Sequence, residues 1–438
     1  MRLFTLYISF LLLMFCCSKA TAQSNFDFPV EKKKAKIHFE LINNLMIVPV
    51  EVNGAQLSFL LDTGVRETVL FNVKKVDSIT LLNTRLLKIK GINDEEIQAL
   101  KSEGNTLKVG GLVCDNHMVY VALNQNEHLS SYLGKEIHGI LGYHFFKNFV
   151  VEVLYQSQLI RVFPEETYKR RWNSFEKVSL DIIKGKPFVN AKVNNRKVNL
   201  LLDTGMSDSL WMFDVDVNSL QNFGYYEDFL GMTISGEITG KRSKIEMLDF
   251  VGQVFKDVKI AYPYKEQLPP ELLEQKNRAG SIGSELLKRF TIVLDYNNEK
   301  MYLKPNKWID EPFYYNKTGI ILRQDGEAVE ANKNNPLLKS LEQNNFISYV
   351  DLSYLLSPEF VIDHVRKNSP ADLVGLQKDD KLIEVNGTKT FRYKLKAINS
   401  LFFDEENKRL ELKVERKGKK LIKIIYLKSP LIKNALVN

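Results

Sequence analysis

The residues best suited to chemistry in this chain are two Asp-Thr-Gly triplets, at residues 62–64 and 203–205, each preceded by a run of apolar residues. Two carboxyls held close together cannot both ionise cheaply, so one keeps a proton while the other stays charged. The charged carboxylate can take a proton from water, and the protonated one can hydrogen-bond a carbonyl oxygen. The triplets therefore predict hydrolysis by Asp62 and Asp203, with no metal and no other cofactor.

The surroundings of the two triplets repeat at the same spacing of 141 residues. Identical residues superpose at this offset without a gap, among them Gly139 on Gly280, Gly142 on Gly283, Lys147 on Lys288, Phe149 on Phe290 and Tyr155 on Tyr296. Such agreement over more than a hundred residues indicates two copies of one structural unit. Alternating strand patterns and turn signals dominate each copy, so the predicted fold class is mostly β.

These motifs resemble the pepsin and retropepsin superfamily of aspartic proteases, in which an apolar-apolar-Gly loop follows the Asp-Thr-Gly loop. The corresponding residues here are Ile140, Leu141 and Gly142 in the first copy, and Ile282 and Gly283 in the second. The chain is similar to bacterial exported enzymes that carry both lobes and a PDZ domain. The resemblance implies two pseudo-symmetric acid-protease β-barrel lobes, expected at residues 36–165 and 177–305.

The resemblance also implies roles for the residues that follow each Asp. Thr63 and Thr204 are expected to exchange hydroxyl-to-backbone hydrogen bonds that lock the two loops together. Gly64 and Gly205 would let the backbone turn tightly and bring amide groups towards the carboxylates. These four residues are therefore predicted to be the scaffold of the site.

The next position departs from the pepsin pattern, since Val65 and Met206 stand where a Ser or Thr usually donates a hydrogen bond. Losing donors to the charged form raises the pKa values of a carboxyl pair. We therefore predict a pH optimum nearer mild acid or neutrality than that of gastric pepsin. Arg66 and Asp208 are close in sequence and could shift the balance either way.

Each copy also has a Gly-punctuated stretch that could form a hairpin over the site, at residues 90–93 and 231–240. Such a flap would exclude water and hold an extended peptide as an added strand. An ordinary surface hairpin is the alternative for either stretch.

After residue 305 the repeat ends, and residues 360–387 resemble a PDZ domain. A strand there leads to a Ser-Pro-Ala-capped helix and then to a strand that ends in Asn386-Gly387. We expect a PDZ-like α+β domain at residues 313–430, with an insertion around 323–358. PDZ domains bind peptides, often free C-termini, beside a backbone-amide loop. The candidate peptide-binding residues are Gly319, Ile320, Ile321 and Leu322, and a purely structural domain packed on the lobes is the alternative.

Residues 1–22 combine an early Arg, an apolar stretch and Ala20-Thr21-Ala22, which is typical of a cleaved secretory signal. We therefore expect export to the periplasm or the medium. Lipid attachment at Cys16 or Cys17 is the alternative. Cleavage after Ala22 would leave Cys114 as the one cysteine, so no internal disulfide is expected.

Composition excludes several other functions. The net charge of +8 over 438 residues comes from scattered Lys and Arg without a nucleic-acid motif, so no nucleic acid is expected as a partner. Neither a metal-binding HExxH nor a GxSxG motif occurs. The predicted function is an exported aspartic endopeptidase for polypeptides, with a complete active site in one monomer and a PDZ domain that assists substrate binding. A peptide-binding envelope protein with a weak or inactive cleft is the alternative.

Overall fold

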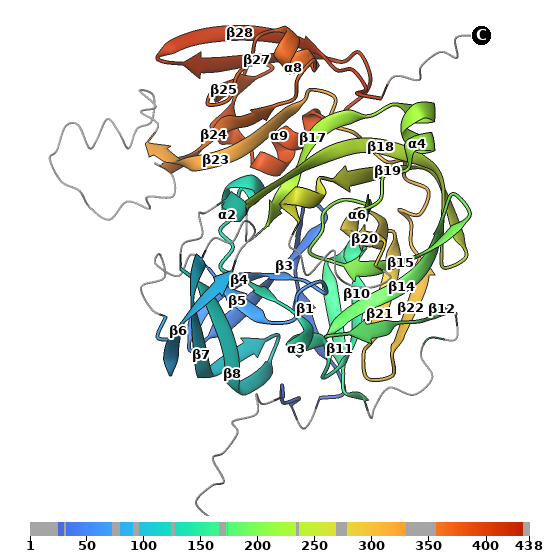
Figure 1. Ribbon diagram of the computed structural model, residues 1–438. Helices are drawn as coiled ribbons and strands as arrows, with labels where there is room; N and C mark the ends of the chain where they lie inside the picture. The colour runs from blue at the N-terminus through green and yellow to red at the C-terminus, as the bar shows by residue number, and fades with distance from the viewer. Residues whose placement is uncertain are drawn as a thin grey trace, which may run out of the picture.

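The structure is a computed structural model of the 438-residue chain, and it describes residues 25–29, 32–71, 79–90, 96–123, 128–165, 172, 174–233, 236–268, 278–329 and 356–431. Strands dominate these residues, which confirms the mostly-β fold class. Two β lobes lie side by side and the C-terminal domain lies against both of them (Figure 1). The predicted signal at residues 1–22 lies outside the described residues.

The first lobe is an eight-stranded sheet of order β2-β3-β4-β9-β5-β8-β7-β6. Its strands are β2 (Glu40–Ile42), β3 (Leu45–Val52), β4 (Ala55–Leu61), β5 (Thr68–Leu70), β6 (Thr84–Lys90), β7 (Glu96–Val109), β8 (Leu112–Ala122) and β9 (Gly139–Leu141). Asn53 and Gly54, with φ of 49° and 92°, form the tight turn that joins β3 to β4. β4 then runs parallel to β9 and delivers the chain to Asp62.

The second lobe repeats this topology strand for strand, in the order β13-β14-β15-β20-β16-β19-β18-β17. Its strands are β13 (Asp181–Ile183), β14 (Lys186–Val193), β15 (Arg196–Asp203), β16 (Leu210–Met212), β17 (Tyr226–Thr233), β18 (Gly236–Phe250), β19 (Gln253–Pro263) and β20 (Gly280–Gly283). Asn194 and Asn195 turn β14 into β15 with φ of 46° and 67°. The duplication predicted from the sequence is therefore present in the fold.

A six-stranded sheet of order β1-β11-β10-β21-β22-β12 joins the lobes. Its strands are β1 (Ala35–His38), β10 (Val150–Leu154), β11 (Leu159–Phe163), β12 (Glu176–Ser179), β21 (Phe290–Asp295) and β22 (Lys300–Pro305). Glu152 on β10 pairs with Val293 on β21, its own counterpart at the 141-residue offset. The axis that relates the two lobes therefore passes through this pair.

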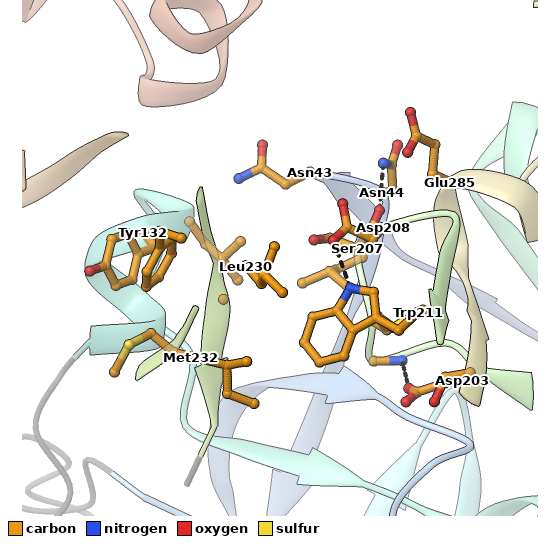
Figure 2. Close-up of a pocket in the computed structure, with 18 of the residues that line it drawn as sticks. Asn43, Asn44, Tyr132, Asp203, Ser207, Asp208, Trp211, Leu230, Met232 and Glu285 are labelled. Carbon is orange, nitrogen blue, oxygen red and sulfur yellow. Dashed lines mark hydrogen bonds between the residues drawn. The ribbon is translucent and has the colours of Figure 1, made fainter. Parts of the chain in front are cut away.

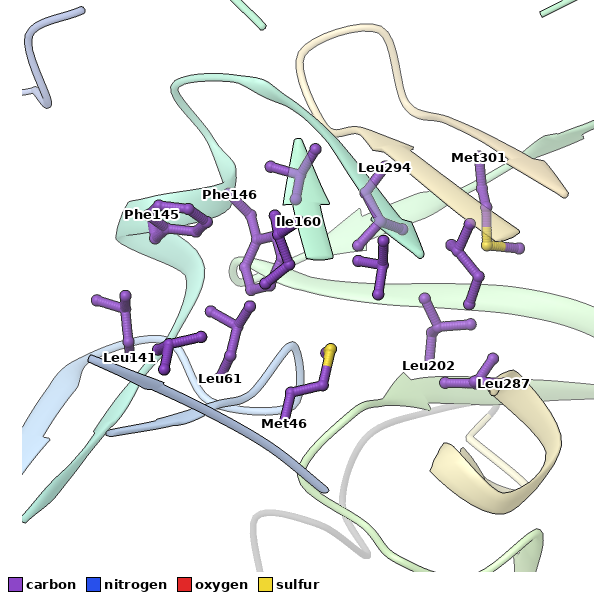
Figure 3. Close-up of a cluster of buried hydrophobic side chains, with 14 of the residues drawn as sticks. Met46, Leu61, Leu141, Phe145, Phe146, Ile160, Leu202, Leu287, Leu294 and Met301 are labelled. Atoms are coloured by element: carbon purple, nitrogen blue, oxygen red, sulfur yellow. The ribbon is translucent and has the colours of Figure 1, made fainter. Parts of the chain in front are cut away.

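One hydrophobic core lies beneath both lobes and this sheet. Leu61, Leu141 and Phe146 of the first lobe belong to the same buried cluster as Leu202 and Leu294 of the second (Figure 3). Because the strands that end at the two triplets are part of this core, burial of their apolar side chains fixes where the triplets lie.

The C-terminal domain has a six-stranded sheet with β23 at its edge. Its elements are β23 (Ile320–Val329), β24 (Leu356–Val365), α8 (Pro370–Leu373), β25 (Lys381–Val385), β26 (Thr388–Lys389), α9 (Leu395–Leu401), β27 (Arg409–Arg416) and β28 (Lys419–Tyr426). The Ser369 side chain caps α8 by accepting from the Asp372 amide, and Pro370 occupies the first turn. Regular strands extend into both ends of the predicted insertion, and residues 330–355 lie outside the described residues.

Short helices complete the lobes: α2 (His128–Leu133), α3 (Tyr143–Phe146), α4 (Val217–Phe223) and α6 (Ser284–Leu287). Within the described part of the chain, no helix is both long and apolar enough to span a membrane. Cys114 is a buried free thiol on β8.

Candidate active site

The two triplets meet at the centre of the molecule through four crossed hydrogen bonds. The Thr63 hydroxyl donates to the Leu202 carbonyl at 2.6 Å and accepts from the Thr204 amide at 3.0 Å. In return, the Thr204 hydroxyl donates to the Leu61 carbonyl at 2.9 Å and accepts from the Thr63 amide at 3.0 Å. All four bonds are buried, so each loop fixes the backbone of the other.

The glycines of the triplets bring the two carboxyls face to face. The amides of Gly64 and Gly205 donate to Oδ1 of their own Asp62 and Asp203 at 2.7 and 3.1 Å. Each glycine also lies against the opposite carboxyl: a Cβ on Gly205 would lie 2.1 Å from Asp62 Oδ2, and one on Gly64 would lie 3.0 Å from Asp203 Cγ. A side chain at either position would push the opposite carboxyl away.

The apolar-Gly loops hold the triplets from the other side. A Cβ on Gly142 would lie 2.2 Å from the Val65 carbonyl oxygen, and one on Gly283 would lie 2.4 Å from that of Asp208. Of the apolar residues in these loops, Leu141 and Ile282 are fully buried in the core, whereas Ile140 lines the cleft. Gly142 and Gly283 thus allow the backbones to cross closely above the core.

Burial raises the pKa of both carboxyls. The pKa of Asp62 rises to about 8, first because the group is removed from water and second because Asp203 is close. Burial also raises the pKa of Asp203, and the positive charge of Arg278 opposes that rise. The direction agrees with the prediction made from Val65 and Met206, but its main cause is burial.

A cleft of about 1100 Å³ opens above the carboxyls. Both lobes and the C-terminal domain line it, with Asp62, Val65, Phe71 and Ile140 from the first lobe, Asp203, Trp211, Phe213, Leu230 and Met232 from the second, and Ile320, Ile321, Leu322 and Phe403 from the third. Figure 2 shows Trp211 near Asp203, with Leu230 and Met232 on the hairpin strand. The first lobe, the second lobe and the C-terminal domain therefore all contribute to the walls of the cleft.

The predicted flap of the second lobe is a hairpin of β17 and β18, and residues 234–235 lie outside the described residues. The C-terminal domain holds its base. Phe229 stacks on His364 with ring centroids 4.7 Å apart, and the Arg366 guanidinium lies 4.5 Å from the Tyr226 ring. In the first lobe β6 pairs with β7, and of the flap predicted at residues 90–93 all but residue 90 lies outside the described residues.

Asp208, a charged residue close in sequence to the second triplet, binds Arg242 and Trp211. Its carboxylate accepts from Arg242 Nη1 at 2.8 Å and from Trp211 Nε1 at 2.8 Å. Arg242 in turn contacts Asp228 on the hairpin at 2.9 Å. Asp208 therefore anchors the hairpin strands to the wall of the cleft.

The backbone-amide loop of the C-terminal domain is satisfied internally. The amides of Thr318 and Gly319 donate to Asn316 Oδ1 at 3.1 and 3.0 Å, and the Ile320 amide donates to the Thr318 hydroxyl at 3.1 Å. Of the candidate peptide-binding residues, Ile320, Ile321 and Leu322 lie beside the cleft shared with the lobes, but Ile320 and Leu322 are buried in the core of the C-terminal domain.

Helix α2 of the first lobe packs against β23 of the C-terminal domain. A Cβ on Gly134, just after α2, would lie 2.7 Å from Leu395 Cβ and 3.5 Å from Gln324 Oε1. The Tyr132 hydroxyl also donates to the Asp363 carboxylate. Figure 1 shows α2 directly beneath β23. The first lobe therefore covers this side of the C-terminal domain.

Lys186 and Arg278 also line the cleft, although they were not among the predicted site residues. A comparison of the two repeats would have identified them. At the 141-residue offset their counterparts are Leu45 and Ile137, so two apolar positions of the first lobe are basic in the second.

Two parts of the chain match known families. Residues 48–145 match the aspartyl protease family, and residues 361–416 match the PDZ domain. A crystal structure of the aspartic proteinase from Irpex lacteus is similar at 12% identity, covering 64% of this chain and 99% of that one, with a TM-score of 0.42. No curated protein matches the chain. The chain thus contains an aspartyl protease domain followed by a PDZ domain, and its enzyme class is that of an aspartic-type endopeptidase.

Proposed function

We propose that this chain hydrolyses peptide bonds with a water molecule held between Asp62 and Asp203. The observation that carries the proposal is the crossed pair of Thr hydrogen bonds, which sets the two carboxyls face to face on the floor of a cleft. Because burial favours the protonated form, the pair holds one proton near neutral pH.

The reaction then needs only these two groups. The ionised carboxylate takes a proton from water as the water oxygen attacks the scissile carbonyl carbon, and the protonated carboxyl donates a hydrogen bond to the carbonyl oxygen. As the tetrahedral intermediate collapses, a proton passes to the leaving nitrogen and the C–N bond breaks. The pair returns to its one-proton state without a covalent enzyme intermediate.

The substrate we propose is an extended polypeptide. Leu230 and Met232 on the hairpin cover the cleft from one side, so a strand of substrate would lie between them and the carboxyls. On the opposite wall, Ile321 adds an apolar surface, whereas Ile320 and Leu322 are buried in the core of the C-terminal domain. The PDZ domain would therefore assist substrate binding as a wall of the protease cleft. Capture of free C-termini is disfavoured because Asn316 already occupies the loop amides.

We also propose that the chain is exported, on the strength of the signal pattern in residues 1–22. Cell fractionation with mass spectrometry of the new N-terminus tests this directly. An N-terminus at Gln23 in the envelope or medium would support export, and an intact Met1 in the cytoplasm would contradict it.

Peptide-library cleavage between pH 4 and pH 8 tests the activity, with Asp203→Asn as the matched variant. We expect the wild type to cut and the variant to bind peptides with little turnover. Cleavage by the variant at the wild-type rate would refute the mechanism. Binding without turnover by both proteins would favour the peptide-binding alternative.

A further inference from the structure

The internal repeat allows each residue beside the carboxyls to be compared with its counterpart in the other lobe. On the first lobe, Leu45, Leu60, Ile137 and Ile140 belong to one buried apolar cluster together with Phe71. At the 141-residue offset, their counterparts on the second lobe are Lys186, Leu201, Arg278, Ser281 and Met212. Lys186, Leu201, Arg278 and Ser281 all line the cleft. The two sides of the site therefore differ in chemistry although they share one fold.

Arg278 is held in place by groups of its own lobe. Its Nη2 donates to the Ser281 hydroxyl at 2.7 Å, and its Nε donates to the Gly280 carbonyl at 3.3 Å. The guanidinium also lies 5.0 Å from the centre of the Phe213 ring. These contacts fix the plane of the guanidinium at the cleft wall and reduce the entropy lost when it binds a ligand.

One end of this guanidinium still requires an acceptor. Arg278 Nη1 is buried, and no hydrogen-bond partner for it exists among the described residues. A buried donor without a partner costs about 1–3 kcal/mol, and more when it carries charge. No ion pair between Arg278 and Asp203 is found among the described residues, although their charges interact. Arg278 therefore brings to the cleft wall a guanidinium with one unpaired donor, which a substrate acceptor could satisfy if the side chain shifts slightly.

Lys186 adds a second positive charge to the same side. It begins β14, lines the cleft, and interacts electrostatically with both Asp62 and Asp203. An apolar or basic substrate side chain would leave Arg278 Nη1 unpaired, a basic one would also be repelled, and a neutral amide would make only an uncharged hydrogen bond. A carboxylate, in contrast, matches the planar fork of a guanidinium.

We propose that the second lobe accepts an acidic side chain next to the scissile bond, while the first lobe accepts a large apolar one. The enzyme would then cut between an apolar residue and an Asp or Glu. This inference rests on the proposed peptidase function and names its substrate class. Arg278 is the specificity-determining residue, and Lys186 supports it.

Matched peptides that differ only by Glu or Gln at each position beside the cut test the proposal. For the wild type we expect kcat/KM to favour Glu by about 10- to 100-fold at one position, as a charge-assisted hydrogen bond implies. Arg278→Ile, which copies the first lobe, should reduce the ratio to near one while cleavage of the Gln peptide persists. Arg278→Gln is the second variant if the first fails to fold.

Lys184→Leu is the matched control, because it removes an exposed positive charge two residues from Lys186 and outside the cleft. It should leave the ratio unchanged, whereas Lys186→Leu should reduce it in part. Cleavage with equal preference for Glu and Gln at both positions would overturn the proposal. So would an Arg278 variant that changes the pH profile but keeps the preference, since Arg278 would then act on Asp203 alone.

Failure of the peptidase function is distinguishable from failure of this inference. If the wild type cuts nothing, the proposed function fails, and binding of the same two peptides to the wild-type chain decides the inference. The acidic subsite would be supported if the wild type bound the Glu peptide tenfold more tightly than the Gln peptide and Arg278→Gln lost this preference. Equal binding of both peptides would overturn it.

Discussion

Replacing Thr63 by Val removes the hydroxyl that joins the two triplets and keeps the shape of the side chain. Two buried hydrogen bonds disappear, one to the Leu202 carbonyl and one from the Thr204 amide. Each bond contributes about 1 kcal/mol net, and a buried group left without a partner costs about 1–3 kcal/mol. We therefore expect Thr63→Val to lower the free energy of unfolding by about 2–4 kcal/mol.

Guanidinium unfolding followed by tryptophan fluorescence measures this change, with Thr291→Val as the control at a half-buried strand position. Thr204→Val should cost a similar amount, because its hydroxyl makes the mirror-image bonds. The double variant should depart from additivity, since the four bonds form one network. A Thr63→Val protein within about 0.5 kcal/mol of the wild type would refute the claim that these bonds fix the loops.

Three further predictions concern the carboxyls and the PDZ loop. The folded-state pKa of Asp62 is raised to about 8, so activity should persist at neutral pH. Activity should fall as pH rises through about 8, because both carboxyls are then ionised. A pH–rate profile with its maximum below about pH 3 would contradict this. Gly205→Ala should lower kcat by about 100-fold or more, because its Cβ would lie 2.1 Å from Asp62 Oδ2. Gly64→Ala should lower kcat less, because its Cβ would lie 3.0 Å from the nearest atom. Steady-state kinetics would show equal losses if the crossed glycine packing were irrelevant. Finally, peptides with a free or an amidated C-terminus should bind Asp203→Asn with affinities within about twofold of each other, because the Asn316 side chain already accepts from the loop amides. Calorimetry that shows a tenfold preference for the free acid would contradict this role of Asn316.

The sequence predicted the parts of the molecule that depend on local pattern and repetition. The Asp-Thr-Gly triplets and the 141-residue offset were sufficient for the two-lobed β fold, because a repeated strand order follows from a repeated apolar pattern. The N-terminal cap of α8 was also predictable from the sequence, because Ser369 and Pro370 stabilise the first turn through local contacts.

Features that depend on contacts between distant segments were not predictable. Nothing local to α2 indicates that it packs against the C-terminal domain, because that contact joins residues far apart in the chain. Likewise, the sequence attributed the raised pKa to missing hydroxyl donors at Val65 and Met206, whereas burial by the whole fold is the larger cause. The repeat does show that Arg278 replaces the apolar Ile137 at the 141-residue offset, but its position in the cleft depends on the tertiary fold.

A carboxyl-carbon NMR titration of the wild type and of Asp203→Asn tests the proton-sharing pair most directly. We predict that the wild type shows two coupled steps, the upper one near pH 8, because burial and the neighbouring charge hold one proton on the pair. In Asp203→Asn the Asp62 signal should titrate in one step at lower pH, since the neighbouring negative charge is gone. If both carboxyls of the wild type titrated independently near their ordinary pKa of 3.8, and Asp203→Asn left Asp62 unchanged, the two groups would not form a dyad.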